Sequence, residues 1–510
     1  MMKKPISVHP FLFAAYPVLF LYAHNIRSAT LGDALTSMAL ALGLALVLWA
    51  VLGLVLRHAQ KAAIGASMLL VLFFSYGHVH SIIDGIVVRG VDLSRPRYLL
   101  ALWALLAVLG FWTLLRTRRS LQSVTNFLNV VAIALVAMSL LDVAAYRFQA
   151  RDQHATGTTS SETLPGPSPA VAFPDIYYII LDGYASASTL QEVYGFDNAP
   201  FLVQLQAMGF QVASESVSNY AQTFLSLASS LNMRYLEDLV ECSGADSEDR
   251  SLPYQLIRNS EVLRFVKAKG YRFVNLRSGW GPTDRNEHAD LDIACGLDNE
   301  FLMALAQTTA LQSLQPYLLQ VARNRVLCAF ATLPEVPGRV AGPRFVLAHI
   351  TVPHPPFLFG AHGEPVTSTF YEMTGWIWTQ QENYVHQVEF VNTQVLPMLE
   401  RILSNSERPP VIILQADHGP ASTFSDPKGP GWDDPTDAMF EERMRILNAY
   451  YLPQGGSVQV YDSITPVNTF RLIFNTYLGA GYDLLQDRSY YSSYKRPYRF
   501  RDVTDLVSHP

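Results

Sequence analysis

The sequence predicts a bundle of five transmembrane helices followed by an α/β domain with a central, mostly parallel sheet between helices. Two observations indicate this fold class. Apolar residues are concentrated in five stretches before residue 146, and from Asp175 onward short apolar runs alternate with longer amphipathic stretches. Of the 510 residues, 50% are hydrophobic and only 16% are charged, whereas soluble proteins usually carry about 25% charged residues. Part of the chain is therefore expected to lie in lipid.

The five apolar stretches lie near residues 10–26, 38–56, 62–83, 98–115 and 127–145, which predicts a transmembrane domain over residues 1–146. Each approaches the ~20 residues that an apolar helix needs to cross the hydrocarbon of a bilayer. The second stretch is the clearest, because Met38 to Leu56 contains no charged residue. The first is short and contains Pro17, but no small-residue cleavage site follows it. We therefore interpret it as a retained span and not as a signal peptide.

Positive charges in the short connections predict the orientation of these spans. Seven lysines and arginines fall on one predicted side and four on the other: Lys3, Lys4, Arg57, Lys61, Arg116, Arg118 and Arg119 against Arg27, Arg89, Arg95 and Arg97. The excess predicts an N-terminus on the cytoplasmic side. An odd number of spans then carries everything after residue 146 to the outer face of the inner (plasma) membrane, and one miscounted span would reverse this result.

Three ionisable residues fall near the predicted outer ends of the third and fifth spans, namely His78, His80 and Asp142. Such residues are candidates for function, although solvation at the membrane surface is the interpretation we prefer. The formal net charge is −6 and no block of like charge stands out. Nucleic acid is therefore not expected as a partner.

Residues 147–173 are predicted to be a linker, because residues 150–173 are rich in Thr, Ser, Pro and Gly without an apolar period. The second domain then covers residues 174–510. Its apolar, β-branched runs lie at residues 176–181, 271–276, 344–350, 411–416 and 446–452. Continuous hydrophobicity of this kind is typical of strands that are buried on both faces by helices.

Three cysteines are present, Cys242, Cys295 and Cys328, and none forms a CxxC pair. A zinc ribbon and a thioredoxin-type motif are therefore excluded. Cys242 and Cys295 form a disulfide if the domain lies in an oxidising compartment, and two buried free thiols are an equally good interpretation.

Polar side chains follow three of the predicted strands directly. Asp182 follows the first run, Asp417 and His418 follow the fourth, and His349 and His354 lie at the end of the third. Because ligands of open α/β sheets bind at the carboxyl ends of the strands, we expect these side chains to converge. Carboxylates and imidazoles together are ligands for a divalent metal such as zinc or manganese. Taken singly, an aspartate after a strand often only makes a turn or caps the next helix.

A candidate nucleophile lies in the segment SNYAQTFLSLASSLNMRY, residues 218–235. Thr223 opens a stretch with helical spacing, so that its hydroxyl would lie at a helix N-terminus, where free N–H groups and the helix dipole stabilise an alkoxide or a phosphate. An ordinary N-cap is the alternative for this residue. Ser226, one helical turn later, is the rival nucleophile.

Taken in order, ILDGY, the hydroxyl-bearing helix start, HPPF and ADHG resemble the sulfatase-like branch of the alkaline phosphatase superfamily over about residues 174–475. Aligned with the arylsulfatase signature, Thr223 takes the place of the nucleophile, and the chain matches at Ser226, Ala228, Ser229, Leu231 and Arg234. Leu225 and Leu227 stand where the signature has proline and arginine. Formylglycine cannot be made from threonine, so sulfate-ester hydrolysis by that mechanism is not expected.

With a threonine at this place, the chain is similar to the membrane-bound lipoteichoic acid synthases and phosphoethanolamine transferases. Those proteins also have five N-terminal spans and an extracytoplasmic catalytic domain. The resemblance implies that the threonine attacks a phospholipid headgroup phosphate, forms a phosphothreonine-type intermediate and passes the group to a hydroxyl-bearing acceptor. It implies a metal held by Asp182, Thr223, Asp417 and His418, catalysis by Thr223 and His354, and substrate binding by His349 and His354.

Asp182 departs from those transferases, which commonly have glutamate at that place. The identity and number of metal ions therefore stay open, with zinc or manganese expected and calcium or magnesium as alternatives. Three other functions stay open too. They are a phosphodiesterase or phosphatase that uses water as acceptor, a sulfatase, and a catalytically degenerate protein of envelope assembly. Metal content would separate the last from the enzymes.

Overall fold

The computed structural model describes residues 6–26, 29, 31–83, 86–88, 91–154, 173–296, 300–366, 378, 380–425 and 431–508. The chain divides into two compact units. The first consists of Met1–Thr158 and Asp298–Leu318, and the second of Thr159–Leu297 and Leu319–Pro510. The second unit is thus interrupted in sequence by a short segment that belongs to the first. The predicted domain boundaries at residues 146 and 174 stay a prediction.

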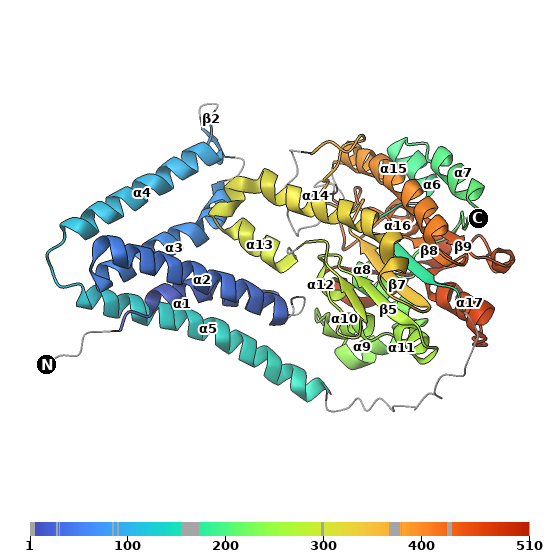
Figure 1. The fold of residues 1–510 in the computed structure, drawn as a ribbon, viewed down its shortest axis with the longest axis horizontal. Helices are drawn as coiled ribbons and strands as arrows, with labels where there is room; N and C mark the ends of the chain where they lie inside the picture. The colour runs from blue at the N-terminus through green and yellow to red at the C-terminus, as the bar shows by residue number, and fades with distance from the viewer. Residues whose placement is uncertain are drawn as a thin grey trace. The chain divides into compact units, whose positions relative to one another are not determined.

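Five helices of the described N-terminal residues belong to the first unit (Figure 1). These are α1 (His9–His24), α2 (Leu31–Leu56), α3 (Ala59–Ile83), α4 (Pro96–Arg116) and α5 (Gln122–His154), with the short strands β1 (Val87–Val88) and β2 (Val91–Asp92) between α3 and α4. Four of the helices, α2 to α5, are long and apolar enough to cross a membrane. Helix α1 has only 16 residues, so the predicted count of five spans is not confirmed.

Helix α1 lies inside this unit and packs against α2, α3 and α5. Its Ala14 and Val18 are fully buried together with Ala45 of α2 and Leu70 of α3. Asn129 of α5 also fixes the N-terminus of α1, because its side-chain oxygen accepts hydrogen bonds from the N–H groups of residues 8 and 9. Whether α1 crosses the membrane decides between four and five crossings, and with it the face on which the second unit emerges.

The charged residues used to predict orientation are only partly visible, because Lys3, Lys4, Arg27 and Arg89 lie outside the described residues. Most of the predicted linker is outside them as well, while α5 continues to His154.

The three ionisable residues near the predicted outer span ends have different surroundings. His78 and Asp142 are exposed, as surface solvation predicts. His80 is instead buried, and its Nδ1 lies 3.0 Å from the side-chain nitrogen of Gln312.

The second unit is built on a seven-stranded sheet with the order β4-β9-β8-β3-β7-β5-β6. The strands β8, β3, β7, β5 and β6 are parallel, and β9 and β4 are antiparallel to their neighbours. The strands are β3 (Ile176–Leu181), β4 (Gln211–Val212), β5 (Arg272–Leu276), β6 (Leu291–Ile293), β7 (Arg344–Ile350), β8 (Val411–Gln415) and β9 (Asn448–Tyr451). All five predicted apolar runs are strands of this mostly parallel sheet.

Helices connect these strands. In chain order they are α6 (Ala187–Tyr194), α7 (Ala199–Ala207), α8 (Thr223–Asn232), α9 (Asp238–Ser243), α10 (Ser251–Arg258), α11 (Glu261–Ala268), α12 (Gly281–Asp284), α13 (Glu300–Thr308), η1 (Ala310–Leu314), α14 (Gln315–Thr332), η2 (Leu333–Gly338), α15 (Gln381–Asn405), α16 (Asp437–Met444), η4 (Gly456–Gln459), α17 (Pro466–Leu478) and α18 (Thr504–Val507). A hairpin of β10 (Tyr490–Ser493) and β11 (Arg496–Asp502) precedes α18.

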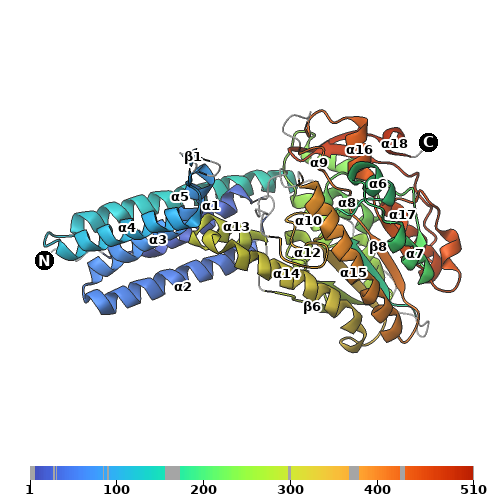
Figure 2. The same ribbon diagram turned by 90° about the horizontal axis from the view of Figure 1, so that it is seen from above.

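Helices cover both faces of the sheet, as the continuous hydrophobicity of its strands predicts (Figure 2). Along β3, Tyr177, Ile179 and Leu181 belong to one buried cluster, with residues of α6, α7 and α15. The alternate residues of β3 belong to a second cluster, with residues of α8, α10, α11 and α17.

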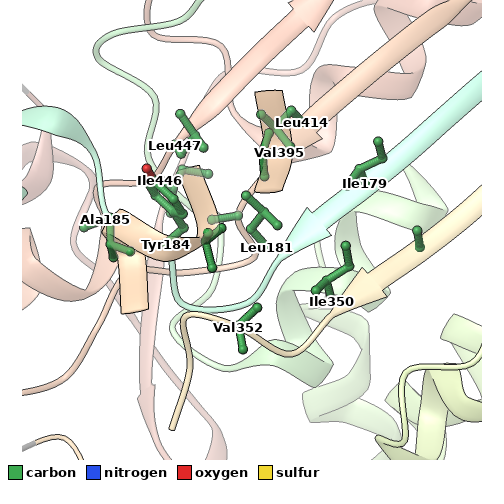
Figure 3. Close-up of a cluster of buried hydrophobic side chains, with 14 of the residues drawn as sticks. Ile179, Leu181, Tyr184, Ala185, Ile350, Val352, Val395, Leu414, Ile446 and Leu447 are labelled. Atoms are coloured by element: carbon green, nitrogen blue, oxygen red, sulfur yellow. The ribbon is translucent and has the colours of Figure 1, made fainter. Parts of the chain in front are cut away.

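The first cluster surrounds the end of β3, where Leu181 lies beside Ile350, Val395 and Leu414 (Figure 3). Fully burying one such side chain stabilises the fold by about 1.5–3 kcal/mol. Replacing Ile179 by alanine should cost about 2–5 kcal/mol, since a cavity would remain. The strand ends are therefore held rigidly.

The cysteine prediction was wrong. Cys295 forms a disulfide with Cys328, and Cys242 is free and exposed. The Cα atoms of the bonded pair are 5.5 Å apart, within the usual range for a disulfide. Chain folding between them, and not spacing in the sequence, brings these two residues together.

Candidate active site

Three neighbouring strands present polar residues at the same edge of the sheet. In the order β8-β3-β7, Leu181 pairs with Ile350 and Ile180 pairs with Gln415. Parallel strands in this register end side by side, so Asp182, His349 and Asp417 come together at their carboxyl ends. The residues predicted from strand-end positions are thus neighbours in space.

Asp182 follows β3 and is almost completely buried. Its Oδ2 lies 3.2 Å from Nε2 of His349, and its Oδ1 lies 3.7 Å from Nε2 of His418. The Oδ1 atom nevertheless has no hydrogen-bond partner among the described residues. Gly183 makes the turn after it with φ +74°, and a Cβ there would lie 2.8 Å from the Trp378 ring.

Asp417 and His418 follow β8, and both are buried. Asp417 Oδ1 accepts a hydrogen bond from the N–H of Gly183 at 3.1 Å, whereas its Oδ2 has no hydrogen-bond partner in the described part of the chain. His418 Nδ1 lies 2.9 Å from the carbonyl oxygen of Gly419. Since a carbonyl only accepts, Nδ1 carries the proton, and the unprotonated Nε2 lies 3.2 Å from Asp417 Oδ2 and 3.7 Å from Asp182 Oδ1.

Thr223 is the first residue of α8, and its Oγ1 lies 2.8 Å from Nε2 of His418. The backbone N–H groups of Leu225 and Ser226 donate to the carbonyl of Gln222. The two N–H groups before them, at positions 223 and 224, have no intrahelical acceptor, as is general for the first turn of a helix. A half-buried hydroxyl therefore lies at a helix N-terminus beside the cluster of carboxylates and imidazole.

Ser226, the rival nucleophile, is used differently. Its side chain is buried, and its hydroxyl donates a hydrogen bond of 2.7 Å to the carbonyl oxygen of Asp417. This bond fixes α8 against the end of β8. The two hydroxyls lie one turn apart on the same helix, but they have different hydrogen-bond partners.

Both predicted substrate histidines contact Asp182, His354 through its backbone and His349 through its side chain. His354 is half-buried, its backbone N–H donates to the carbonyl of Asp182, and its Nδ1 lies 2.6 Å from the carbonyl of Pro355. Its ring centroid lies 6.2 Å from that of His418. His349 is fully buried against Asp182, with Nδ1 2.9 Å from the hydroxyl of Thr283. His354 is the more accessible of the two.

The electrostatics of the cluster favour a cation. Burial and the nearby charge of Asp182 raise the pKa of Asp417 to about 7. Burial acts in the same direction on Asp182, but His354 and His349 outweigh it and hold its pKa below the ordinary value. Burial and then the charge of Arg443 lower the pKa of His418 well below its usual range, so its imidazole is neutral. A neutral imidazole beside two buried carboxylates is a ligand set for a metal.

The residues present fit a divalent metal. Asp182, Asp417 and His418 each offer a ligand atom within 4.8 Å of the others. Two carboxylate oxygens of this cluster, Asp182 Oδ1 and Asp417 Oδ2, are buried without hydrogen bonds in the described part of the chain. Buried polar atoms are normally satisfied, so these two carboxylate oxygens are suited to bind a cation.

Two residues of α16 support the site and were not predicted from the sequence. Arg443 is buried and donates to the carbonyl of Ala221 at 2.7 Å and to that of Gly419 at 2.8 Å. It therefore connects the segment before Thr223 to the segment after His418. Burial lowers the pKa of Arg443 to about 10, which leaves it charged at neutral pH. Glu442 accepts hydrogen bonds from Ser422 and fixes the following turn.

No protein-family model matches this chain, and no curated protein matches it. Among solved structures, it is similar to the zinc complex of the C-terminal periplasmic domain of EcEptC from Escherichia coli, with 13% identity and a TM-score of 0.45 over 67% of this chain and 96% of that one. It is also similar to the integral membrane lipooligosaccharide phosphoethanolamine transferase A of Neisseria meningitidis, with 11% identity and a TM-score of 0.39 over 91% and 92% of the two chains.

A third similar structure is BT33494S-sulf of Bacteroides thetaiotaomicron, from a locus for glycosaminoglycan metabolism, with 13% identity and a TM-score of 0.35 over 60% and 72% of the two chains. The solved structures are thus phosphoethanolamine transferases and sulfatases, the groups that the sequence motifs resemble. Likenesses this distant say nothing about what this chain binds or transforms, which has to follow from its own residues.

Proposed function

We propose that this protein is a metal-dependent transferase that moves a phosphate-containing group from a membrane phospholipid headgroup to a hydroxyl-bearing acceptor. One observation carries the proposal: the hydroxyl of Thr223, at the start of α8, lies 2.8 Å from Nε2 of His418, beside two buried carboxylates. A threonine hydroxyl is a weak nucleophile unless its surroundings activate it. This arrangement supplies such surroundings.

Asp182, Asp417, His418 and Thr223 would hold the metal in this proposal. Two carboxylates, an imidazole and a hydroxyl favour zinc or manganese, since calcium and magnesium prefer oxygen ligands alone. A divalent ion bound there would lower the pKa of the threonine hydroxyl and neutralise charge on the phosphoryl oxygens.

In the first step, Thr223 Oγ1 forms a bond to the phosphorus while the bond from phosphorus to the oxygen of the lipid breaks. The proton of the threonine hydroxyl ends on the departing alcohol, so the step is balanced without a further reactant. We assign the transfer of that proton to His354, because it is half-buried and its ring centroid lies 6.2 Å from that of His418, which contacts Thr223. The free N–H groups at the start of α8 stabilise the charged phosphoryl oxygens.

In the second step, the hydroxyl of the acceptor attacks the phosphothreonine and restores Thr223. The proton of the acceptor moves back to Thr223, and His354 is again the group to which we assign its transfer. Water in place of the acceptor would make the same residues a phosphodiesterase.

We place the second unit at the outer face of the inner (plasma) membrane, which requires α1 as a fifth crossing; the apolar helices support attachment to a membrane, and the disulfide supports the outer face. Four helices are apolar enough to cross a bilayer, which would bring a lipid donor close to the enzyme. The Cys295–Cys328 disulfide is typical of an oxidising compartment.

The test is to trap the intermediate on the full chain reconstituted with phospholipids. We expect mass spectrometry of a peptide over residues 219–234 to find the phosphate-containing adduct on Thr223. Thr223→Ala should abolish turnover and leave the metal content largely intact, because the carboxylates and the imidazole supply most of the binding. Ser226→Ala is the matched control, and its effect on turnover should be milder. An adduct on Ser226, or full activity of Thr223→Ala, would overturn the assignment. Discharge of the adduct at the same rate with and without an added alcohol acceptor would make the enzyme a hydrolase.

A further inference from the structure

Between strands β6 and β7 the chain leaves the second unit and enters the first. Residues Asp298–Leu318 belong to the same compact unit as the N-terminal helices, although the sequence on either side belongs to the second unit. This excursion contains helix α13, the short helix η1 and the first residues of α14. The disulfide between Cys295 and Cys328 closes it at its base, because the two cysteines lie on either side of it in the sequence.

The inner side of the excursion is packed into the N-terminal bundle. Phe301 and Leu305 of α13 are buried in one cluster with Leu70 and Phe74 of α3. Helix α13 contacts α2 as well as α3. Both of those helices are long and apolar enough to cross a membrane.

The contact between the excursion and α3 is specific in shape and in polarity. A Cβ at Gly77 would lie 1.8 Å from the carbonyl oxygen of Gln307, so only glycine permits this approach. One turn further, His80 Nδ1 lies 3.0 Å from the side-chain nitrogen of Gln312. Both residues are in the last two turns of α3, which ends at Ile83. The excursion therefore lies at the level where that span ends.

The outer side of the excursion is apolar and exposed. Leu311, Leu314 and Tyr317 are 39%, 46% and 72% exposed, respectively. Residues three apart are aligned on a 3-10 helix, so the first two form a stripe that Tyr317 continues into α14. Ile82 of α3, two residues beyond His80, is 75% exposed. Large exposed apolar side chains next to a predicted span are what a bilayer would cover, and tyrosine is typical of the membrane–water interface.

We propose that residues 300–318 are a second membrane anchor of the second unit. The inner side docks on α2 and α3, and Leu311, Leu314 and Tyr317 insert into the boundary between headgroups and acyl chains of a phospholipid bilayer. The first attachment is the connection after α5. The chain crosses the membrane twice, in α4 and α5, between the end of α3 and the end of α5. The two helices therefore end on the same face, and both attachments leave the membrane on that face. The proposal does not depend on the reaction that the site performs.

The first experiment removes the other attachment. A site-specific protease sequence replaces residues 160–166 of the full chain in proteoliposomes, and the vesicles are cleaved and washed with high salt. We expect the fragment that begins after the cut to stay with the vesicles. Appearance of that fragment in the supernatant would overturn the proposal.

The second experiment separates the two sides of the anchor. Leu311→Asp, Leu314→Asp and Tyr317→Asp together should increase the released fraction by about tenfold or more, because three side chains are removed from lipid. These residues are exposed, so the fold of the unit is retained. The control replaces Val203 and Leu484, apolar residues of the second unit that are 60% and 46% exposed, by aspartate, and release should not change. Equal release for both sets would contradict insertion of the stripe.

A direct readout uses a fluorophore on Tyr317→Cys in a Cys242→Ser background. Phospholipids that carry a nitroxide near the headgroup should quench it strongly, and a fluorophore on Val203→Cys reports the background for an exposed site. No more quenching at position 317 than at position 203 would show that the stripe does not reach lipid.

Discussion

Replacing Asp417 by asparagine should change the stability of the protein in opposite directions with and without a divalent metal. Asp417 and Asp182 are both buried, and their ligand atoms lie within 4.8 Å of each other. Asparagine removes one of the two charges and has almost the same shape. Its side-chain oxygen still accepts the hydrogen bond from the N–H of Gly183.

The magnitude follows from the distance and from the pKa of Asp417. Two unit charges 4.8 Å apart repel by about 3.5 kcal/mol at an effective dielectric constant of about 20. Burial and the charge of Asp182 raise the pKa of Asp417 from 3.8 to about 7, which corresponds to about 4 kcal/mol. The pKa shift contains desolvation as its largest cause in addition to this repulsion, so it represents the whole electrostatic cost that a bound cation would offset.

The pH window follows from the sign of this shift. In the unfolded chain Asp417 ionises near pH 4, but in the folded, metal-free protein it ionises only near pH 7. The charge of Asp417 therefore costs no stability below pH 4, an increasing amount between pH 4 and 7, and the full amount above pH 7. Asp417→Asn removes this cost, so its stabilising effect should be about 4 kcal/mol at pH 8 and about 2 kcal/mol at pH 5.

The assay is thermal unfolding of the full chain in detergent micelles, with either EDTA or saturating zinc or manganese. In EDTA at pH 8 the variant should melt several degrees above the wild type, since 1 kcal/mol corresponds to about 2–4 °C in a large domain. With metal it should melt below the wild type, because a ligand is lost and a hundredfold weaker affinity removes about 2.7 kcal/mol.

Asp290→Asn is the control, because the N–H of Phe273 and the charges of Lys267 and Arg272 outweigh burial and hold the pKa of Asp290 below its ordinary value. It should lower the melting temperature with and without metal. If Asp417→Asn also lowered the melting temperature in EDTA at pH 8, the two carboxylates would not repel each other and the inferred cation site would be refuted.

Three further predictions concern other parts of the chain. Ser226→Ala should cost about 1–2 kcal/mol of unfolding free energy, since the carbonyl of Asp417 loses its donor. Urea unfolding would measure this loss, and no change would mean that the hydrogen bond does not hold α8. Replacing Cys295 and Cys328 by serine should cost about 4 kcal/mol, the loop-closure value for a separation of 33 residues, and a variant as stable as the oxidised wild type would contradict this. A reporter fused after Pro510 should be extracytoplasmic if α1 is a fifth span; a cytoplasmic signal would leave four spans and remove the lipid donor.

The sheet and its polar edge were predictable because each depends on local sequence. Residues 176–181, 344–350 and 411–416 are apolar without alternation, which is what burial on both faces requires. Once three such runs are parallel neighbours, the residue after each one must lie at the same edge. The proximity of Asp182 and Asp417 follows from that geometry, and His349 joins them from the last position but one of β7.

The supports of the site were not predictable, because they depend on contacts between distant segments. Arg443 donates a hydrogen bond to the carbonyl of Ala221, which precedes it by 222 residues. A single sequence does not distinguish this arginine from a solvated one in the same helix. The pairing of Cys295 with Cys328 also depends on where the chain returns after the excursion. Helix α13 has only nine residues, too few to be recognised as a membrane element by length.

The choice between Thr223 and Ser226 shows where sequence reasoning ends and structure is needed. Residues three apart lie on the same side of a helix, so both hydroxyls point toward the end of β8, and helical spacing favours neither. Their hydrogen bonds differ, because Ser226 donates to the carbonyl of Asp417 while Thr223 contacts Nε2 of His418. The hydrogen bond of Ser226 fixes α8 against the end of β8, which is followed by the metal-ligand candidates Asp417 and His418. It thereby sets the position of the second hydroxyl, so that Ser226 positions α8 and Thr223 is left to react.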